Sequence, residues 1–328
     1  MSRRNKPGKQ PGLRSEMRTA AFEGLTDDHS KRTYRRGIDR FLAWLRPEGE
    51  EARFTPAEVR QMPGIVLQLY CNAMADEGLS AATIHTYLAP LCKALGVPMN
   101  VIQKPVRRAA EITRSRDDAA TGRDRGGEEI ASGRYALSVS LQEALGLRKG
   151  ELARLTPESL HSDAQGLYVE VRGKGGKLQH QRILPDDAAR VQEAFGRGLT
   201  GQRLLRPSDL GPHIDYHSMR AAHARDAYAY YLAICQQPGG RERLQAQLYD
   251  TLEALHPFRD QHDREHVLAT FRQDLTNGHG VYSLRGELRA RAQALGRPTE
   301  YDRTALMCVS VWHLAHWRNE VTVSHYMI

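Results

Sequence analysis

The stretch that decides the fold spans residues 146–184 and reads GLRKGELARLTPESLHSDAQGLYVEVRGKGGKLQHQRIL. Residues 150–155 are expected to form a short helix. Apolar and polar residues then alternate over 167–171, which is typical of a half-buried strand. The glycines within 173–176 predict a turn, and residues 178–184 can return as a second strand. The stretch therefore predicts a helix followed by a hairpin with lysines at its tip.

Helical periodicity dominates on both sides of this hairpin. Residues 135–145 are expected to form a helix that ends at the turn before the quoted stretch. From Asp215 the pattern is helical nearly to the last residue. We therefore expect residues 133–328 to form one domain that is mainly α with a small β-hairpin or sheet.

A second, all-helical domain is expected over residues 25–104. Apolar residues at helical spacing predict a helix over 30–45, with a basic start. Thr55-Pro56-Ala57-Glu58 combines an N-cap hydroxyl, a proline at the first helical position and a glutamate at the third, which indicates a helix start. A further helix is expected from its cap at Ser80 to a stop at Gly96.

Two segments lack the apolar residues that a core requires. Residues 1–24 are rich in arginine and lysine among glycine and proline, and we expect a flexible basic arm. Residues 105–132 include RDDAATGRDRGGEE and are expected to form the linker between the two domains. The sequence thus predicts an arm, a helical domain, a linker and a mixed α/β domain.

The charge balance favours a polyanionic partner. The 328 residues contain 47 Lys and Arg against 39 Asp and Glu, which gives a formal charge of +8 and an isoelectric point near 9.4. No apolar run approaches the roughly eighteen residues that span a bilayer, so we expect no membrane partner. The basic start lacks an apolar signal region, which favours a cytoplasmic, nucleoid-associated protein. The four cysteines are widely spaced and fit reduced, buried thiols.

Four short segments each carry a charged or nucleophilic side chain. They are GLRKGELARL, RGKGGK, HSMR and LAHWRNEVTVSHY. The side chains concerned are, in chain order, Arg148, Lys174, His217, Arg220, His316 and Tyr326. Taken singly, each segment is equally compatible with a solvated or structural residue, and the order of the whole set is what points to chemistry.

This set matches the needs of phosphodiester exchange without a metal ion. The two arginines can hold the non-bridging oxygens, because a guanidinium donates parallel hydrogen bonds and stays charged at neutral pH. Lys174 can donate a proton to the departing oxygen, and a histidine can accept or relay one. Tyr326 becomes a nucleophile where nearby cations favour its phenolate.

The ordered set resembles the tyrosine recombinase, or phage integrase, family. The segment LSAATIHTYLAPLCKALG also resembles the core-binding domain of that family. The resemblance implies a two-domain clamp around double-stranded DNA carrying specific recombination sites, and a homo-tetramer on that DNA. It also implies a 3′-phosphotyrosine intermediate, exchange through a four-way junction and no metal or nucleotide cofactor.

The sequence departs from the family pattern in four places. Ala221 stands where a histidine often follows the second arginine, and Ala315 replaces the usual glycine before the second histidine. An insertion of several helices, about 236–300, separates these two segments. Only two residues follow Tyr326, so we expect the tail that many relatives dock onto a neighbour to be absent or removed.

Three alternatives compete with the recombinase interpretation. A type IB topoisomerase would use similar residues but relax supercoils as a monomer, and a non-catalytic DNA-binding protein could keep the fold. His256, His262, Glu265 and His266 have tolerable metal-ligand spacing, although a solvated polar face explains them better. His325 could compete with His316, but adjacent residues on a helix point in different directions.

Overall fold

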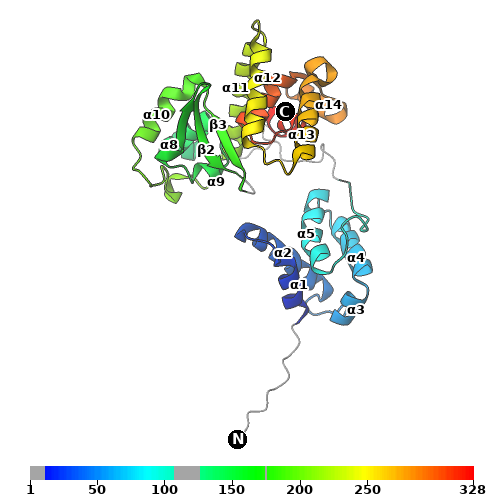
Figure 1. Cartoon of the computed structure of the whole chain (residues 1–328). Coiled ribbons are helices and arrows are strands. Elements are labelled where there is room, and N and C mark those ends of the chain that lie inside the picture. Colours follow the sequence, from blue (N-terminus) through cyan, green and yellow to red (C-terminus); the bar gives the residue numbers. More distant parts are fainter. Residues whose placement is uncertain (1–11, 107–125, 174–175) are drawn as a thin grey trace. The chain divides into compact units, whose positions relative to one another are not determined.

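The computed structural model describes residues 12–106, 126–173 and 176–328 (Figure 1). The chain divides into two compact units, residues 1–111 and 112–328. Both are mainly helical, and the second also contains small antiparallel sheets. The expected fold class, mainly α with a small sheet, is therefore confirmed.

The first unit is a bundle of helices around one apolar core. Its helices are α1 (Leu13–Phe22), α2 (Asp28–Leu45), α3 (Pro56–Gln61), α4 (Pro63–Asp76) and α5 (Ala81–Ala94). The helix starts follow the capping signals of the sequence, since the Thr55 hydroxyl accepts from the Glu58 amide at 3.3 Å and Ser80 accepts from Thr83 at the same distance. The helices expected in this region are confirmed.

The expectation of a flexible arm over residues 1–24 is wrong from residue 13 onward. Helix α1 buries Leu13, Met17 and Ala21, which lie four residues apart and form one apolar stripe. The Nη2 of Arg18 also donates to both carboxylate oxygens of Asp39 in α2, at 2.8 and 3.0 Å. The basic composition of this segment concealed a short amphipathic helix, while residues 1–11 lie outside the described part of the chain.

The first half of the second unit contains the hairpin that the sequence predicted. Its elements are α7 (Gly127–Ala131), α8 (Ala136–Leu145), α9 (Lys149–Leu152), η2 (Pro157–Ser159), β1 (Leu160–Asp163), β2 (Gly166–Arg172), β3 (Leu178–Arg182), η4 (Pro185–Asp187), α10 (Ala188–Gly196) and η5 (Pro207–Asp209). The sheet order is β1-β2-β3, all antiparallel, with Val169 opposite Gln181. Strand β1 was not anticipated, and the expected helix over 150–155 is shorter than predicted.

The expected linker, residues 105–132, also needs a correction at its end. Residues 127–131 form helix α7, and the Glu129 carboxylate accepts a hydrogen bond from the His213 amide at 3.3 Å. Gly126 precedes the helix with φ +87°, and its backbone lies against Ile214. These last residues therefore belong to the second unit, and residues 107–125 lie outside the described ranges.

The second half of this unit is helical around a long central helix. Its elements are α11 (Tyr216–Cys235), α12 (Gly240–Leu255), α13 (Gln261–Thr276), η6 (Asn277–Gly280), β4 (Val281–Ser283), α14 (Gly286–Ala294), β5 (Glu300–Asp302), α15 (Arg303–Trp312), α16 (Asn319–Thr322) and the π-helical turn η7 (Val323–Met327). The helices expected in the insertion are present, and the ribbon formed by β4 and β5 was not anticipated. No helix in the described ranges is both long and apolar enough to span a membrane.

The insertion is an integral part of the second unit. Leu244, Leu248 and Leu252 of α12 are buried in one core with residues of α11 and α15. The indole nitrogen of Trp312 donates to the Thr251 hydroxyl at 3.0 Å, which joins α15 to α12. The extra helices thus pack directly on α11 and α15.

Candidate active site

Arg148 lies at the start of α9, directly after the sharp turn that follows α8. Gly146 ends α8 with φ +56°, a conformation that glycine adopts readily. Arg148 then caps α9, and its Nη1 donates to Oε1 of the buried Glu151 at 2.7 Å. The backbone amide of Arg148 donates to the other carboxylate oxygen at 2.9 Å. The carboxylate therefore fixes both the backbone and the guanidinium of this arginine, whose side chain remains 32% exposed.

Arg220, on α11, is fully buried and bonded to two separate segments. Its Nη1 donates to the Gly146 carbonyl oxygen and its Nη2 donates to that of Leu314 at 2.8 Å. Its Nε is buried without a hydrogen-bond partner among the described residues. Burial lowers the pKa of this guanidinium, the Tyr326 hydroxyl opposes that shift and the charge of Arg148 adds to it. An arginine so placed keeps its charge at neutral pH and retains N–H donors for an anion.

His316 lies in a short loop after α15 and contacts the hydroxyl of Tyr326. Its amide donates to the Ser310 carbonyl at 2.9 Å, and its Nε2 lies 3.2 Å from the Tyr326 hydroxyl oxygen. Burial, together with the charges of Arg220 and Arg148, lowers the pKa of His316 to about 3. The ring is therefore neutral at physiological pH. Its Nε2 can accept from the Tyr326 hydroxyl in the tautomer that carries the hydrogen on Nδ1, and the same burial and charges make the protonated ring less favourable.

Tyr326 itself is 4% exposed and lies among the other side chains of the set. The Arg220 guanidinium carbon is 5.7 Å from the centre of its ring. The ring of His217 meets it edge to face, with centroids 5.5 Å apart. His217 is exposed near the start of α11, where the Asp215 side chain accepts from its amide at 3.0 Å. Helix α11 and the loop after α15, which are distant in sequence, thus place His217, Arg220 and His316 around one phenol.

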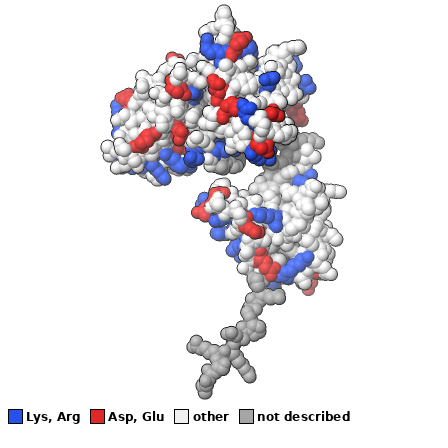
Figure 2. All heavy atoms as spheres, in the orientation of Figure 1, with Lys and Arg blue, Asp and Glu red and all other residues white. Residues whose placement is uncertain are grey.

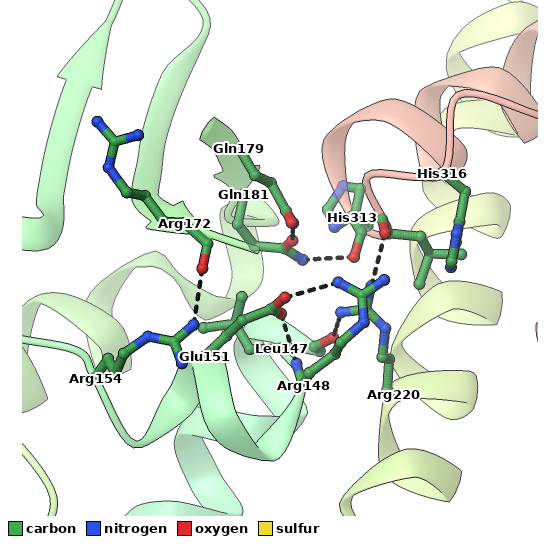
Figure 3. A network of polar contacts seen from close by, with 12 residues as sticks. Leu147, Arg148, Glu151, Arg154, Arg172, Gln179, Gln181, Arg220, His313 and His316 are labelled. Carbon is green, nitrogen blue, oxygen red and sulfur yellow. Dashed lines mark hydrogen bonds and ion pairs between the residues drawn. The ribbon is translucent and has the colours of Figure 1, made fainter. Parts of the chain in front are cut away.

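Figure 3 shows the guanidinium groups of Arg148 and Arg220 and the imidazole of His316 close together, between α9, α11 and the loop after α15. Of the six side chains predicted from the sequence, five lie in this group: Arg148, His217, Arg220, His316 and Tyr326. Their catalytic roles stay predictions.

Lys174 lies outside the described residues, so only the flanks of its turn can be described. The Gly173 amide donates to the Lys177 carbonyl at 2.8 Å, which closes the hairpin. A Cβ built on Gly173 would lie 3.2 Å from the Glu151 carboxylate and 3.7 Å from Arg148 Nη1. The residue that precedes Lys174 therefore packs against the Arg148–Glu151 pair, while Lys177 is exposed.

The sequence interpretation missed Glu151. A carboxylate three residues after an arginine at a helix start is a recognisable capping pattern, because it can accept from the N-cap amide. Glu151 is 2% exposed and supplies the acceptor that orients Arg148. The signal is present in GLRKGELARL, where the glutamate stands three residues after the arginine.

A buried chain of hydrogen bonds beside Arg220 was also missed. His223 Nδ1 is 2.9 Å from the Glu143 carbonyl oxygen, which can only accept, so this nitrogen carries the proton. His223 Nε2 then accepts from His313 Nδ1 at 2.8 Å, and the Tyr231 hydroxyl donates to His313 Nε2 at 3.0 Å. Burial lowers the pKa of His223 to about 4 and that of His313 well below its ordinary value. Both rings are therefore neutral, and each nitrogen in the chain has one defined role.

No group of three or more histidine, cysteine or carboxylate side chains in the described ranges is arranged to hold a metal ion. The rival set around His262 therefore does not come together as a metal centre. Its carboxylate, Glu265, instead accepts from the side-chain Nε2 of Gln261 at 2.9 Å along an exposed face of α13.

Comparisons with known proteins add little to this geometry. No family model matches the chain, and no curated protein sequence does. One similar solved structure is described as the crystal structure of XerA recombinase, with 16% sequence identity and a TM-score of 0.22. The alignment covers 67% of this chain and 84% of that one.

Proposed function

We propose that the protein is a tyrosine site-specific DNA recombinase that cleaves and rejoins DNA strands through Tyr326. The observation that carries the proposal is the contact between the Tyr326 hydroxyl and the neutral His316 imidazole, 3.2 Å apart, beside the buried Arg220. A phenol next to a base and a fixed cation is the arrangement that activates a tyrosine nucleophile.

In the proposed reaction, the Tyr326 oxygen attacks the phosphorus of a phosphodiester and passes its proton to His316 Nε2. Arg148 and Arg220 bind the two non-bridging oxygens, where negative charge grows in the transition state. The bond to the 5′-oxygen breaks, and this oxygen leaves with a proton from Lys174. The product is a 3′-phosphotyrosine and a free 5′-hydroxyl, and the reverse steps rejoin the strand. His217, at the exposed edge of the ring, is a second proton relay.

Basic surfaces on both units support DNA as the substrate. On the first unit, the N-terminal half of α2 carries four basic residues, none of which forms an ion pair with the described acidic residues: Lys31, Arg32, Arg35 and Arg36. On the second unit, Figure 2 shows Lys and Arg side chains gathered along the edge where α9 and the β2–β3 hairpin lie. Such surfaces bind phosphates without reading sequence. The clamp and the homo-tetramer on paired sites belong to the same proposal.

The test uses a nicked suicide substrate, from which a cleaved strand cannot be rejoined. The wild type is expected to form a covalent adduct that survives denaturant and persists in excess EDTA. Tyr326→Phe is expected to lose the adduct while DNA binding changes less than about threefold, because only the attacking oxygen is removed. Tyr249→Phe is the matched control, because the ring of Tyr249 packs on Phe271, whereas the hydroxyl of Tyr326 contacts His316.

Supercoiled DNA carrying two candidate sites separates the alternatives. Recombined products support the proposal, whereas relaxation without recombination indicates a type IB topoisomerase. Retardation in a gel without cleavage indicates a DNA-binding protein that lacks catalysis. An adduct that persists in Tyr326→Phe would show that the nucleophile has been assigned to the wrong residue.

A further inference from the structure

The insertion contains a small ribbon and helix that the proposed chemistry does not use. Strands β4 and β5 pair antiparallel, with Tyr282 opposite Tyr301, and α14 connects them. The Leu284 amide donates to the Thr299 carbonyl at 2.8 Å and closes the base of this element. We refer to residues 281–302 as the ribbon–helix insert.

The buried face of the ribbon–helix insert packs against the segment that carries Tyr326. Leu284 and Ala292 are at most 1% exposed and belong to one apolar cluster with Val323 and Met327. This cluster is separate from the larger core that contains Tyr326 and the helices α11, α12 and α15. Figure 1 shows the end of the chain beside α14 within this unit.

The spacing of these residues explains how one turn can contact two clusters. Val323 and Met327 lie four residues apart and share a face of the turn η7, while Tyr326 belongs to the other cluster. The segment is therefore held on one side by apolar packing and on the other by the groups around the phenol.

Helix α11 links the insert to the same segment through two hydrogen bonds. Arg225 Nη1 donates to the Tyr326 carbonyl oxygen at 3.1 Å. The Tyr228 hydroxyl accepts from the Asp302 amide at 2.9 Å, at the end of β5. Helix α11 also carries His217 and Arg220. It therefore contacts both the insert and the segment that carries Tyr326, and it contributes two side chains to the site.

We propose that the ribbon–helix insert is a socket that positions the nucleophile within its own chain, with Leu284 and Ala292 as positioning residues for Val323 and Met327. The proposal rests on the proposed function of Tyr326. Reactions between positioned groups lose about a hundredfold in rate when a group is misplaced by about 1 Å. A loosened socket is therefore expected to slow cleavage without weakening the binding of DNA.

The experiment compares Leu284→Ala and Met327→Ala with Leu205→Ala, each in the full-length chain. Leu205 is 1% exposed in the core around the β1–β3 sheet, so its truncation is a matched loss of a buried leucine away from the insert. Four quantities are measured: unfolding stability, the dissociation constant for the suicide substrate, the rate of adduct formation at saturating DNA, and hydrogen exchange of residues 323–328 without DNA.

Leu284→Ala and Met327→Ala are expected to slow adduct formation by about 10- to 100-fold and to speed exchange of residues 323–328, with the dissociation constant changed less than about threefold. Leu284→Met is expected to recover most of the rate, and Leu205→Ala to lose stability with a nearly unchanged rate. Equal losses of rate in Leu205→Ala and Leu284→Ala would overturn the proposed role of the insert, and so would a normal rate in both Leu284→Ala and Met327→Ala. Either result would leave the proposed function of the protein in place. Failure of the wild type to form any adduct would instead overturn the proposed function, and the role of the insert with it.

Discussion

The buried histidine His223 gives a quantitative prediction for the pH dependence of stability. Its side chain is 2% exposed, and burial lowers its pKa from 6.5 to about 4. The unfolded chain therefore binds a proton as the pH falls below about 6.5, whereas the folded chain does not until about pH 4. The stabilisation is fully present above pH 6.5 and is lost as the pH falls toward 4.

The magnitude follows from the two pKa values. Between these two pKa values, the unfolded chain holds one more proton than the folded chain at this histidine. The free energy of unfolding therefore falls by about 1.4 kcal/mol for each unit by which the pH is lowered. For His223 the free energy of unfolding is expected to fall by about 2 kcal/mol between pH 7 and pH 5. His313, whose pKa burial also lowers, adds a loss of the same sign.

The assay is urea denaturation at pH 5, 6 and 7 in a Trp44→Phe background, so that the fluorescence of Trp312 and Trp317 reports on the second unit. His223→Gln keeps an amide that can donate to the Glu143 carbonyl and accept from His313, but it does not titrate. The fall between pH 7 and pH 5 should be smaller by about 2 kcal/mol in this variant. The exposed His213→Gln is the control. Parallel pH profiles for the wild type and His223→Gln would refute the reasoning.

Two further predictions concern backbone positions beside the site. Ala315→Gly is expected to raise the free energy of unfolding by about 0.5–1 kcal/mol, because Ala315 has φ +52° and an alanine is strained there; an unchanged or lower value in the same assay would contradict this. Gly146→Ala is expected to destabilise the second unit by about 3 kcal/mol or more, because its φ is +56° and its Cβ would lie 2.3 Å from the His223 ring; a fully stable variant would show that this ring can move aside.

Local signals in the sequence predicted most of the helices and the hairpin. The capping box at Thr55 and the cap at Ser80 depend only on residues within one turn, so pattern and geometry agree. The short strands β1, β4 and β5 were missed because each has only three or four residues, too few to show an alternating pattern. Their formation depends on partners elsewhere in the chain.

Helix α1 shows how composition can conceal periodicity. The arginines of the first residues indicated a flexible arm, yet Leu13, Met17 and Ala21 form a continuous buried stripe. The ion pair between Glu16 and Arg60 of α3, at 2.8 Å, adds a contact that no local pattern contains. Charge describes the solvent face of such a helix and says little about its buried face.

For the candidate site, the sequence could predict only which side chains take part and their order along the chain. Five of the side chains named from the sequence lie together in the structure, but no pattern in the sequence predicted the burial of Arg220. That burial depends on acceptors from two distant segments, the carbonyl oxygens of Gly146 and Leu314. The chain through His223, His313 and Tyr231 is equally invisible to spacing arguments, because its members become neighbours only after α11 and α15 pack together.

The bonds of Arg220 also explain why a long insertion between the second arginine and the second histidine is compatible with an intact site. Burying the Nη2 group of Arg220 without an acceptor would cost free energy, so the bond to the Leu314 carbonyl oxygen favours a fold that keeps this carbonyl beside α11. The loop that this contact closes includes the insertion, but each doubling of loop length costs only about 0.6 kcal/mol of closure entropy. The insertion offsets this cost by burying its own leucines against α11 and α15. Its length therefore does not govern the geometry around Tyr326, which depends on the two fixed ends and on the surfaces that the insertion packs against them.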